Sequence, residues 1–259
     1  MGHVRLKNLP KSLWWDQVVE LLDDGGTVNE IAPATALAMD EALVGAIRDP
    51  ALTQAALLLA ALPGAARQAD FASACRAIGI NVSAAPSLLD TLAGFERAVD
   101  REARMRGGRT DLGEMAQLAA ASSLTRCMTP DLPALFGTTP GDVKAALAKL
   151  DTPERFAKLS RIFFADLMQR SLEYYLSRTY AQHIGPSETF ASLAEQDIFR
   201  AALATHCYQT ALIVEGYSAD WFSKTKFDGG LSHQSAAKFT RTAIGKLRKE
   251  LKRQSRSDG

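Results

Sequence analysis

Apolar side chains recur at intervals of three and four residues along most of this chain, and that spacing constrains the fold more than any other feature. In the segment 154–183, for example, Phe156, Leu159, Phe163 and Leu167 follow it. The period is that of an α-helix, whereas a half-buried strand alternates with a period of two. Proline, glycine and capping residues divide the pattern into segments of helical length. We therefore predict an all-α protein built as a multi-helix bundle.

The boundaries of the expected helices follow from capping residues and from helix breakers. The expected helices are 14–22, 28–47 with an early interruption at Pro33, 51–62, 66–78, 88–106, 111–127, one starting at Pro140, 154–183, 193–217 and 233–253. Pro63-Gly64 should separate two of them, and 220–230 should be a loop that holds Trp221 and Phe222. The core-facing side of helix 88–106 should carry Leu89, Leu92, Phe95, Val99 and Ala103.

The densest run of proline and glycine lies between Met128 and Gly141 and predicts a boundary in the chain. We expect an N-terminal helical domain over 1–128 and a C-terminal helical domain over 129–259, or else one continuous domain. Helices 154–183 and 193–217 are both apolar over more than half of their circumference. They should therefore pair antiparallel at the centre of the C-terminal half.

Charge is unevenly distributed, although 30 basic and 29 acidic side chains nearly cancel over the 259 residues. From Lys224 onward there are ten Lys and Arg against three acidic residues, a net charge of +7. The preceding 223 residues therefore carry a net charge of −6. No global field attracts nucleic acid or an anionic membrane, but the C-terminal segment could do so locally.

The three cysteines, Cys75, Cys127 and Cys207, are widely spaced and lie in apolar helical patterns. We expect them to be reduced, buried side chains rather than nucleophiles. The longest apolar stretch, 55–62, is much shorter than the ~20 residues of a membrane-spanning helix. With no signal peptide in the pattern, these features predict a cytoplasmic protein with no membrane partner.

Common catalytic and cofactor motifs are absent from the sequence. It has no glycine-lysine phosphate loop, dinucleotide fingerprint, nucleophile elbow or paired CxxC. Nucleotide-dependent enzymes and α/β-hydrolases are therefore disfavoured. We predict no cofactor, no metal site and no catalytic residue of a recognisable kind.

Glu173, His183, His206 and Glu215 are the side chains in the 153–217 hairpin with ligand chemistry. At 1.5 Å per residue, His206 should lie beside 170–173, ~20 Å from the turn that holds His183. The histidines should not meet, and a structural hydrogen bond is favoured over a metal ligand for His206. Tyrosines also cluster there or at its end, namely Tyr174, Tyr175, Tyr180, Tyr208 and Tyr217. Core packing is favoured over a ligand pocket as their role.

The C-terminal helix has the most specific pattern. Thr240, Ile244, Leu247 and Leu251 form one narrow apolar seam. The remaining faces carry the candidate binding residues Lys238, Arg241, Lys246, Arg248, Lys249, Lys252 and Arg253. Such a helix can contact nucleic acid phosphates, lie on anionic lipid, or dock its seam on the body and leave the basic face in solvent. Docking is the favoured interpretation.

Three phrases of the sequence resemble a family of uncharacterised helical bacterial proteins. They are Gly108-Arg109-Thr110-Asp111-Leu112-Gly113-Glu114-Met115, Phe163-Phe164-Ala165-Asp166-Leu167 and Trp221-Phe222-Ser223-Lys224. Proteins of that kind resemble accessory proteins encoded beside ATPases and nucleases in anti-phage defence clusters. The resemblance transfers no functional residue.

These patterns together predict a non-catalytic helical module that binds a protein partner within a bacterial assembly. Contact with nucleic acid through the basic terminal helix is an added expectation. The alternative is an enzyme with an unfamiliar helical active site in the 153–217 hairpin. A deep polar pocket would favour the enzyme, whereas an exposed apolar surface would favour the interaction module.

Overall fold

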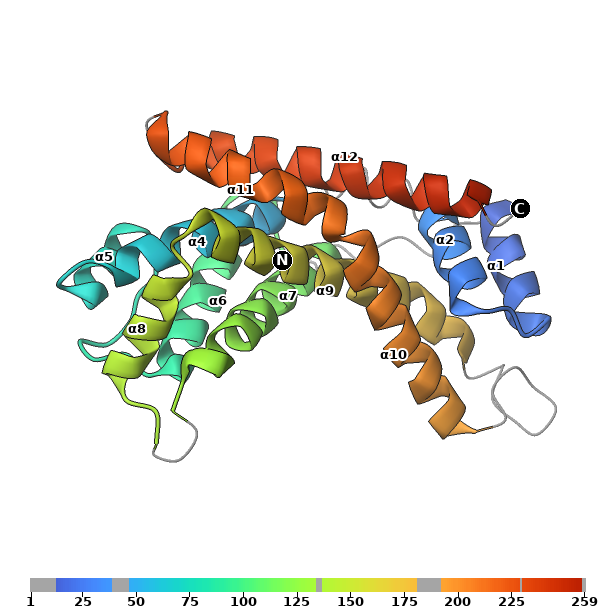
Figure 1. The fold of residues 1–259 in the computed structure, drawn as a ribbon, viewed down its shortest axis with the longest axis horizontal. Helices are drawn as coiled ribbons and strands as arrows, with labels where there is room; N and C mark the ends of the chain where they lie inside the picture. The colour runs from blue at the N-terminus through green and yellow to red at the C-terminus, as the bar shows by residue number, and fades with distance from the viewer. Residues whose placement is uncertain (1–12, 39–46, 134–136, 181–191, 229, 258–259) are drawn as a thin grey trace.

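The computed structural model describes residues 13–38, 47–133, 137–180, 192–228 and 230–257, and within these ranges it contains helices and no strand (Figure 1). This confirms the all-α bundle predicted from the sequence. The elements are α1 Leu13–Asp23, α2 Val28–Ala38, α4 Pro50–Ala66, α5 Phe71–Ala77, α6 Leu88–Met105, α7 Asp111–Met128, the 3-10 turn η1 Thr129–Asp131, α8 Pro140–Lys149, α9 Pro153–Tyr180, α10 Leu193–Thr210, α11 Leu212–Phe227 and α12 His233–Ser257.

The predicted caps begin their helices as expected. Ser87, Thr110 and Ser232 each accept a hydrogen bond from a backbone N–H in the first turn of α6, α7 and α12, at 2.8–3.1 Å. At α8, Thr139 and Asp142 form a complete capping box. These side chains satisfy N–H groups that have no partner within the helix, so the helix starts are encoded locally.

Helix α9 lies at the centre of the second half and packs against α7, α10 and α11 (Figure 1). Helices α10 and α11 run antiparallel to α9. Near the start of α9, Arg161 Nη1 lies 2.9 Å from Glu215 of α11, whereas nearer its end Glu173 lies 3.6 Å from Arg200 of α10. The predicted antiparallel pairing is confirmed.

The partner of α9 is two helices instead of the single predicted helix 193–217. The chain turns at Ala211, which is fully buried, and continues as α11 to Phe227. The predicted loop at 220–230 is therefore wrong for most of its length. Ala211 has no breaker chemistry in the sequence; the bend follows from packing, because α11 covers the first half of α9 while α10 reaches its second half and α2.

The predicted break at Pro63-Gly64 is also wrong, because α4 continues through both residues to Ala66. A proline inside a helix removes one hydrogen bond and costs ~3 kcal/mol. Here Pro63 and the neighbouring Leu62, Ala65 and Ala66 are buried, and that burial opposes the loss. The break lies at 67–70 instead, where Asp70 caps α5.

Two smaller expectations are also wrong. Helix α2 runs through Pro33 without interruption and is stabilised by burial of Ile31 and Thr35. The predicted continuation of this helix over 39–46 lies outside the described residues. Leu89 is 77% exposed, whereas Thr91 and Phe95 of the same helix are buried, so Leu89 does not belong to the core-facing side of α6.

The hydrophobic core crosses the boundary predicted near residue 128. One cluster of buried side chains combines residues of α4, α6 and α7 with residues of α8, α9, α11 and α12. A second cluster joins α1 and α2 to the end of α9 and to α10. The described parts of segments 1–128 and 129–259 thus share their core.

The cysteines match their predicted role. Cys75, Cys127 and Cys207 are free and buried. Burial raises the pKa of Cys75 to about 12 and also raises the pKa of Cys127 and Cys207, which disfavours the thiolate. In the part of the chain that the structure describes, no helix is both long and apolar enough to cross a membrane.

We predict that Phe163→Ala destabilises the protein by about 3–5 kcal/mol, because Phe163 is 1% exposed and packs edge-on against Phe164 at 4.9 Å. Thermal or chemical denaturation of the full chain measures the change. Leu89→Ala, at an exposed position of α6, is the control and should change stability by less than about 0.5 kcal/mol. Equal stability of the two variants would contradict the placement of Phe163 in the core.

Candidate functional site

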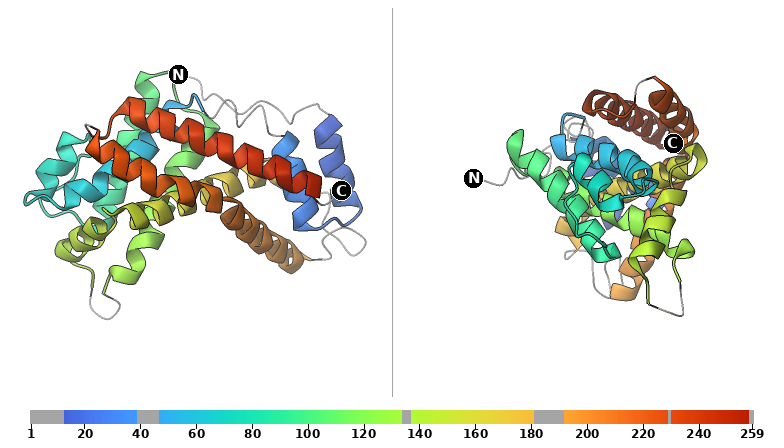
Figure 2. Two further views of the ribbon diagram at one scale, coloured as in Figure 1. Left: turned by 45° about the horizontal axis from the view of Figure 1, so that its top comes forward. Right: turned by 90° about the vertical axis from the view of Figure 1, so that its left-hand side faces the viewer.

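The apolar seam of α12 is docked on the body. Thr240, Ile244, Leu247 and Leu251 are between 0% and 6% exposed. Figure 2 shows α12 lying along the outside of the molecule, beside α11 and extending toward α1 and α2. The favoured interpretation of the seam is confirmed, and the seam is not available to another partner.

The seven basic residues lie on the sides of α12 that the seam leaves uncovered. Lys238, Arg241, Lys249, Lys252 and Arg253 are exposed, and Lys246 and Arg248 are half-buried. From Lys238 to Arg253 they cover ~22 Å of helix axis at 1.5 Å per residue. We call this row of seven residues the basic face of α12.

The members of the basic face differ in their partners. Arg253 pairs with Glu250 through hydrogen bonds of 3.0 and 2.6 Å, and Lys246 lies over the ring of Tyr217 at 5.8 Å. Lys238, Arg241 and Lys249 form no ion pair with any described residue. Their charges therefore remain available to an external anion.

A groove of ≈ 770 Å³ lies beside the basic face, between α11 and α12. Its cations are Lys224, Lys238 and Arg241, and its carboxylates are Asp220 and Asp228. The groove also exposes part of two aromatic rings that are fixed from behind. Tyr217 and Trp221 both stack on buried Phe239, with ring centroids 5.8 and 4.3 Å away.

Sequence reasoning missed this groove because it assigned 220–230 to a loop. The signal was present in the spacing of Val214, Ser218 and Phe222, which are four residues apart and form the buried side of α11. Tyr217 and Trp221 are also four residues apart and lie beside that row. Extending the helical pattern past Tyr217 would have placed both rings at one edge of α11.

Glu173 and Glu215, two of the side chains considered as metal ligands, are engaged in the protein's own contacts. Glu215 pairs with Arg161, and Glu173 contacts Gln169 and Arg200. His183 lies outside the described residues. Among described residues, no three His, Cys, Asp or Glu side chains are grouped in a way that could hold a metal ion.

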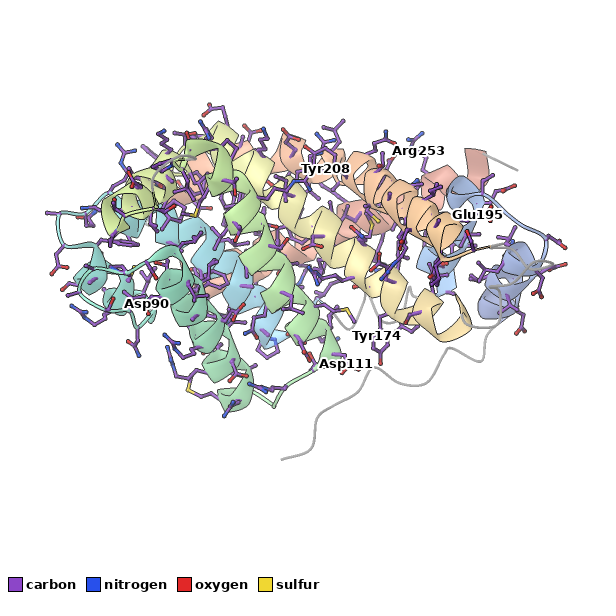
Figure 3. The ribbon with its side chains drawn as sticks, turned by 90° about the horizontal axis from the view of Figure 1, so that it is seen from below. Asp90, Asp111, Tyr174, Glu195, Tyr208 and Arg253 are labelled. Carbon is purple, nitrogen blue, oxygen red and sulfur yellow. The ribbon has the colours of Figure 1, made fainter. Side chains whose placement is uncertain are left out.

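The tyrosines of the hairpin have mixed environments. Tyr175 is buried, and the Tyr174 hydroxyl donates to Asp111 at 2.9 Å, a contact between α9 and α7 (Figure 3). Tyr208 lines a cavity described below, and the side chain of Tyr180 is outside the described set. Core packing is confirmed for Tyr175.

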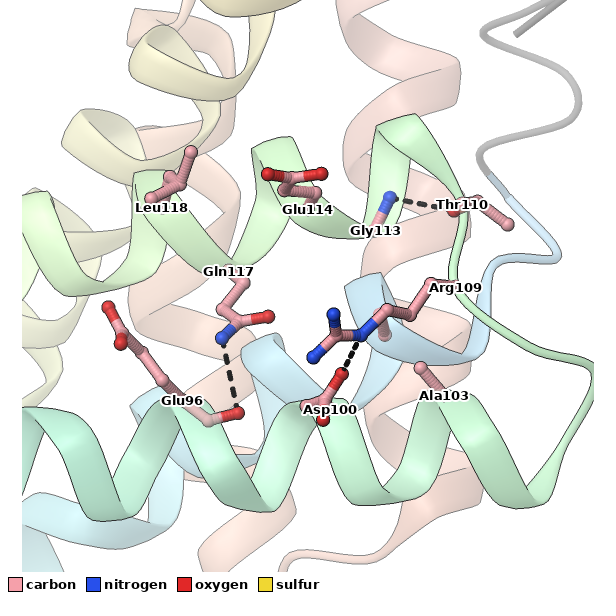
Figure 4. A pocket seen from close by; sticks show the side chains of 10 residues that line it. Glu96, Asp100, Ala103, Arg109, Thr110, Gly113, Glu114, Gln117 and Leu118 are labelled. Carbon is pink, nitrogen blue, oxygen red and sulfur yellow. Dashed lines mark hydrogen bonds and ion pairs between the residues drawn. The ribbon is translucent and has the colours of Figure 1, made fainter. Parts of the chain in front are cut away.

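A small pocket of ≈ 160 Å³ between α6 and α7 contains several residues of the phrase 108–115 (Figure 4). Its polar groups bind one another. Arg109 forms an ion pair with Asp100, and Gln117 Nε2 donates to the Glu96 carbonyl oxygen at 3.2 Å. These contacts hold α6 against α7, and we interpret the pocket as a structural joint.

The same phrase also connects α7 to α4. The Thr110 hydroxyl donates to Asp49, a buried carboxylate that accepts hydrogen bonds from the first turn of α4 at 2.8 and 3.1 Å. A Cβ atom on Gly113 would lie only 2.8 Å from the Ala51 side chain. Glycine at this position therefore lets the two helix N-termini approach closely.

No family model, curated protein or solved structure matches this chain. The resemblance to helical proteins of defence clusters therefore stays a prediction.

The Asp100 ion pairs predict a pH dependence of stability. The Arg109 guanidinium, with help from Arg104, holds the pKa of Asp100 below its usual value of about 3.9. A lowered folded-state pKa stabilises the fold above about pH 4, and this contribution is lost as pH falls through the folded pKa. Asp100→Asn should therefore lower the free energy of unfolding at pH 7 by about 1 kcal/mol or less, seen as a lower melting temperature. The effect should be smaller at pH 3.

The control is Asp197→Asn, an exposed carboxylate of α10 that forms no ion pair with any described residue. Melting curves of both variants and the wild type at the two pH values give the comparison. An Asp100→Asn effect that grows on acidification would contradict the assigned direction.

Proposed function

We propose that this protein is a non-catalytic interaction module of a bacterial assembly that contacts nucleic acid through the basic face of α12. The main support is that Lys238, Arg241 and Lys249 are exposed and without ion pairs among the described residues, opposite a seam that is already buried. Lysine and arginine in such an arrangement neutralise backbone phosphates and release counterions.

The adjoining groove supports nucleic acid as the anionic partner. Trp221 and Tyr217 are held by stacking on Phe239, so their exposed edges are rigid, and Lys238 and Arg241 lie along the same groove. Aromatic rings beside a row of cations are the usual elements of single-strand binding, in which bases stack and phosphates pair with cations.

A protein partner is supported by exposed apolar side chains on α10 and at the start of α11. Leu193, Ile198 and Leu212 are between 56% and 68% exposed. Exposed large apolar side chains of this kind can contribute to a surface for protein contact. The three free, buried cysteines support a cytoplasmic location.

We predict that Lys238→Glu/Lys249→Glu weakens binding to a fluorescein-labelled 20-nucleotide single strand, measured by anisotropy over a series of salt concentrations. For wild-type protein, affinity should fall steeply with salt. The variant should lose about 1.4 units of the log–log slope, because two phosphate contacts are removed and each contributes about 0.7 on a single strand. Circular dichroism should be unchanged, since both lysines are exposed.

The matched control is Arg48→Glu/Arg76→Glu, which changes net charge by the same amount at exposed positions outside α12. It should keep most of the wild-type affinity. Binding that is absent or insensitive to salt in the wild type would refute the proposed nucleic-acid contact, as would an equal loss in both variants.

A further inference from the structure

A further cavity, of ≈ 560 Å³, lies where the end of α7, the first half of α9 and the end of α10 meet. Its volume falls within the range typical of small-molecule sites. The lining consists of Arg126, Cys127, Pro130, Leu150, Arg155, Lys158, Ile162 and Tyr208. No residue of α12 lines it, so it is separate from the basic face.

Three cations and no carboxylate are among the described residues that line this cavity. Arg155 is already paired, since its Nη1 lies 3.0 Å from Asp131, which also binds Lys149 at 2.7 Å. Arg126 and Lys158 form no ion pair with any described residue. Two like charges are thus held beside one cavity without a counter-ion from the protein's described part.

The three charges act on the same place. Burial raises the pKa of the Cys127 thiol, while the positive charges of Lys158, Arg126 and Arg155 all oppose that rise. Their fields therefore converge on the cavity wall at Cys127. An anion placed there would be attracted by all three, most strongly where water is partly excluded.

The Tyr208 ring provides a rigid flat wall. Arg161 donates to the Tyr208 carbonyl oxygen at 3.0 Å and to Glu215 at 2.9 Å, and its guanidinium lies 3.8 Å from the ring centroid. Arg126 approaches the same ring at 5.6 Å. Tyr208 is labelled in Figure 3, beside α9. The contacts with Arg161, a residue of α9, hold it there.

We propose that this cavity binds a small molecule carrying a phosphate monoester, with the phosphate between Arg126 and Lys158. A phosphate monoester carries about −1.5 to −2 charges at pH 7, which matches the two unpaired cations. Arginine can bind two phosphate oxygens at once, and lysine supplies a point charge. Ile162, Leu150 and the Tyr208 ring provide apolar and flat surface for the rest of the molecule, as a nucleoside would require.

The test is calorimetric titration of the full chain at low salt with inorganic phosphate, AMP and adenosine. AMP should bind, inorganic phosphate should compete with it, and adenosine should bind at least tenfold more weakly than AMP. Arg126→Gln/Lys158→Gln should weaken AMP binding by about tenfold or more for each lost charge-assisted contact. Both side chains are exposed, so the variant should melt as the wild type does.

Arg241→Gln/Lys249→Gln, on the basic face of α12, is the matched control and should leave AMP binding unchanged. The proposal is overturned if wild-type protein binds neither AMP nor phosphate, if adenosine binds as well as AMP, or if both double variants lose AMP equally. The proposal is also overturned if AMP does not bind while Arg126→Gln/Lys158→Gln loses binding to a 20-nucleotide single strand. Arg126 and Lys158 would then contact the backbone of a nucleic acid. The α12 control variant is assayed on the same strand. Failure of the cavity proposal can therefore be distinguished from failure of the proposed nucleic-acid contact of α12.

Discussion

The structure depends on a cluster of four aromatic rings that joins α9, α11 and α12. Phe156 stacks on Phe222 at 4.4 Å, Phe239 stacks on Trp221 at 4.3 Å, and Phe156 and Phe239 meet at 5.9 Å. Such rings bury large apolar areas and prefer a few offset or tilted geometries. The cluster therefore stabilises the packing of α12 and also fixes its position relative to α9 and α11.

The orientation of α12 decides where the basic residues go. Phe239, Ile244 and Leu247 belong to the larger buried cluster, whereas Leu251 belongs to the smaller one with α1 and α2. One helix thus contacts both clusters along a single seam. Its opposite sides must then face solvent, and those are the sides on which Lys238, Arg241 and Lys249 lie.

The errors of sequence reasoning share a physical cause. Pro63 is a local signal for a helix break, yet α4 continues through it. Ala211 is a local signal for helix continuation, yet the chain turns there. In each case burial against other helices outweighs the local preference, which is worth a few kcal/mol at most. Local caps such as Ser87 and Thr139 were reliable because their hydrogen bonds lie within four residues and need no distant partner.

The sequence by itself determined the all-α class, most helix starts and the apolar seam of α12, because periodicity and capping are local properties. Only the tertiary structure decided that α10 and α11 are separate helices, that Tyr217 and Trp221 line a groove with Lys238, and that Arg126, Lys158 and Tyr208 surround one cavity. The cavity residues come from α7, α9 and α10, which are separated in the chain, whereas the groove residues come from the consecutive helices α11 and α12. Their meeting depends on how buried faces fit together, which a single-helix pattern does not specify.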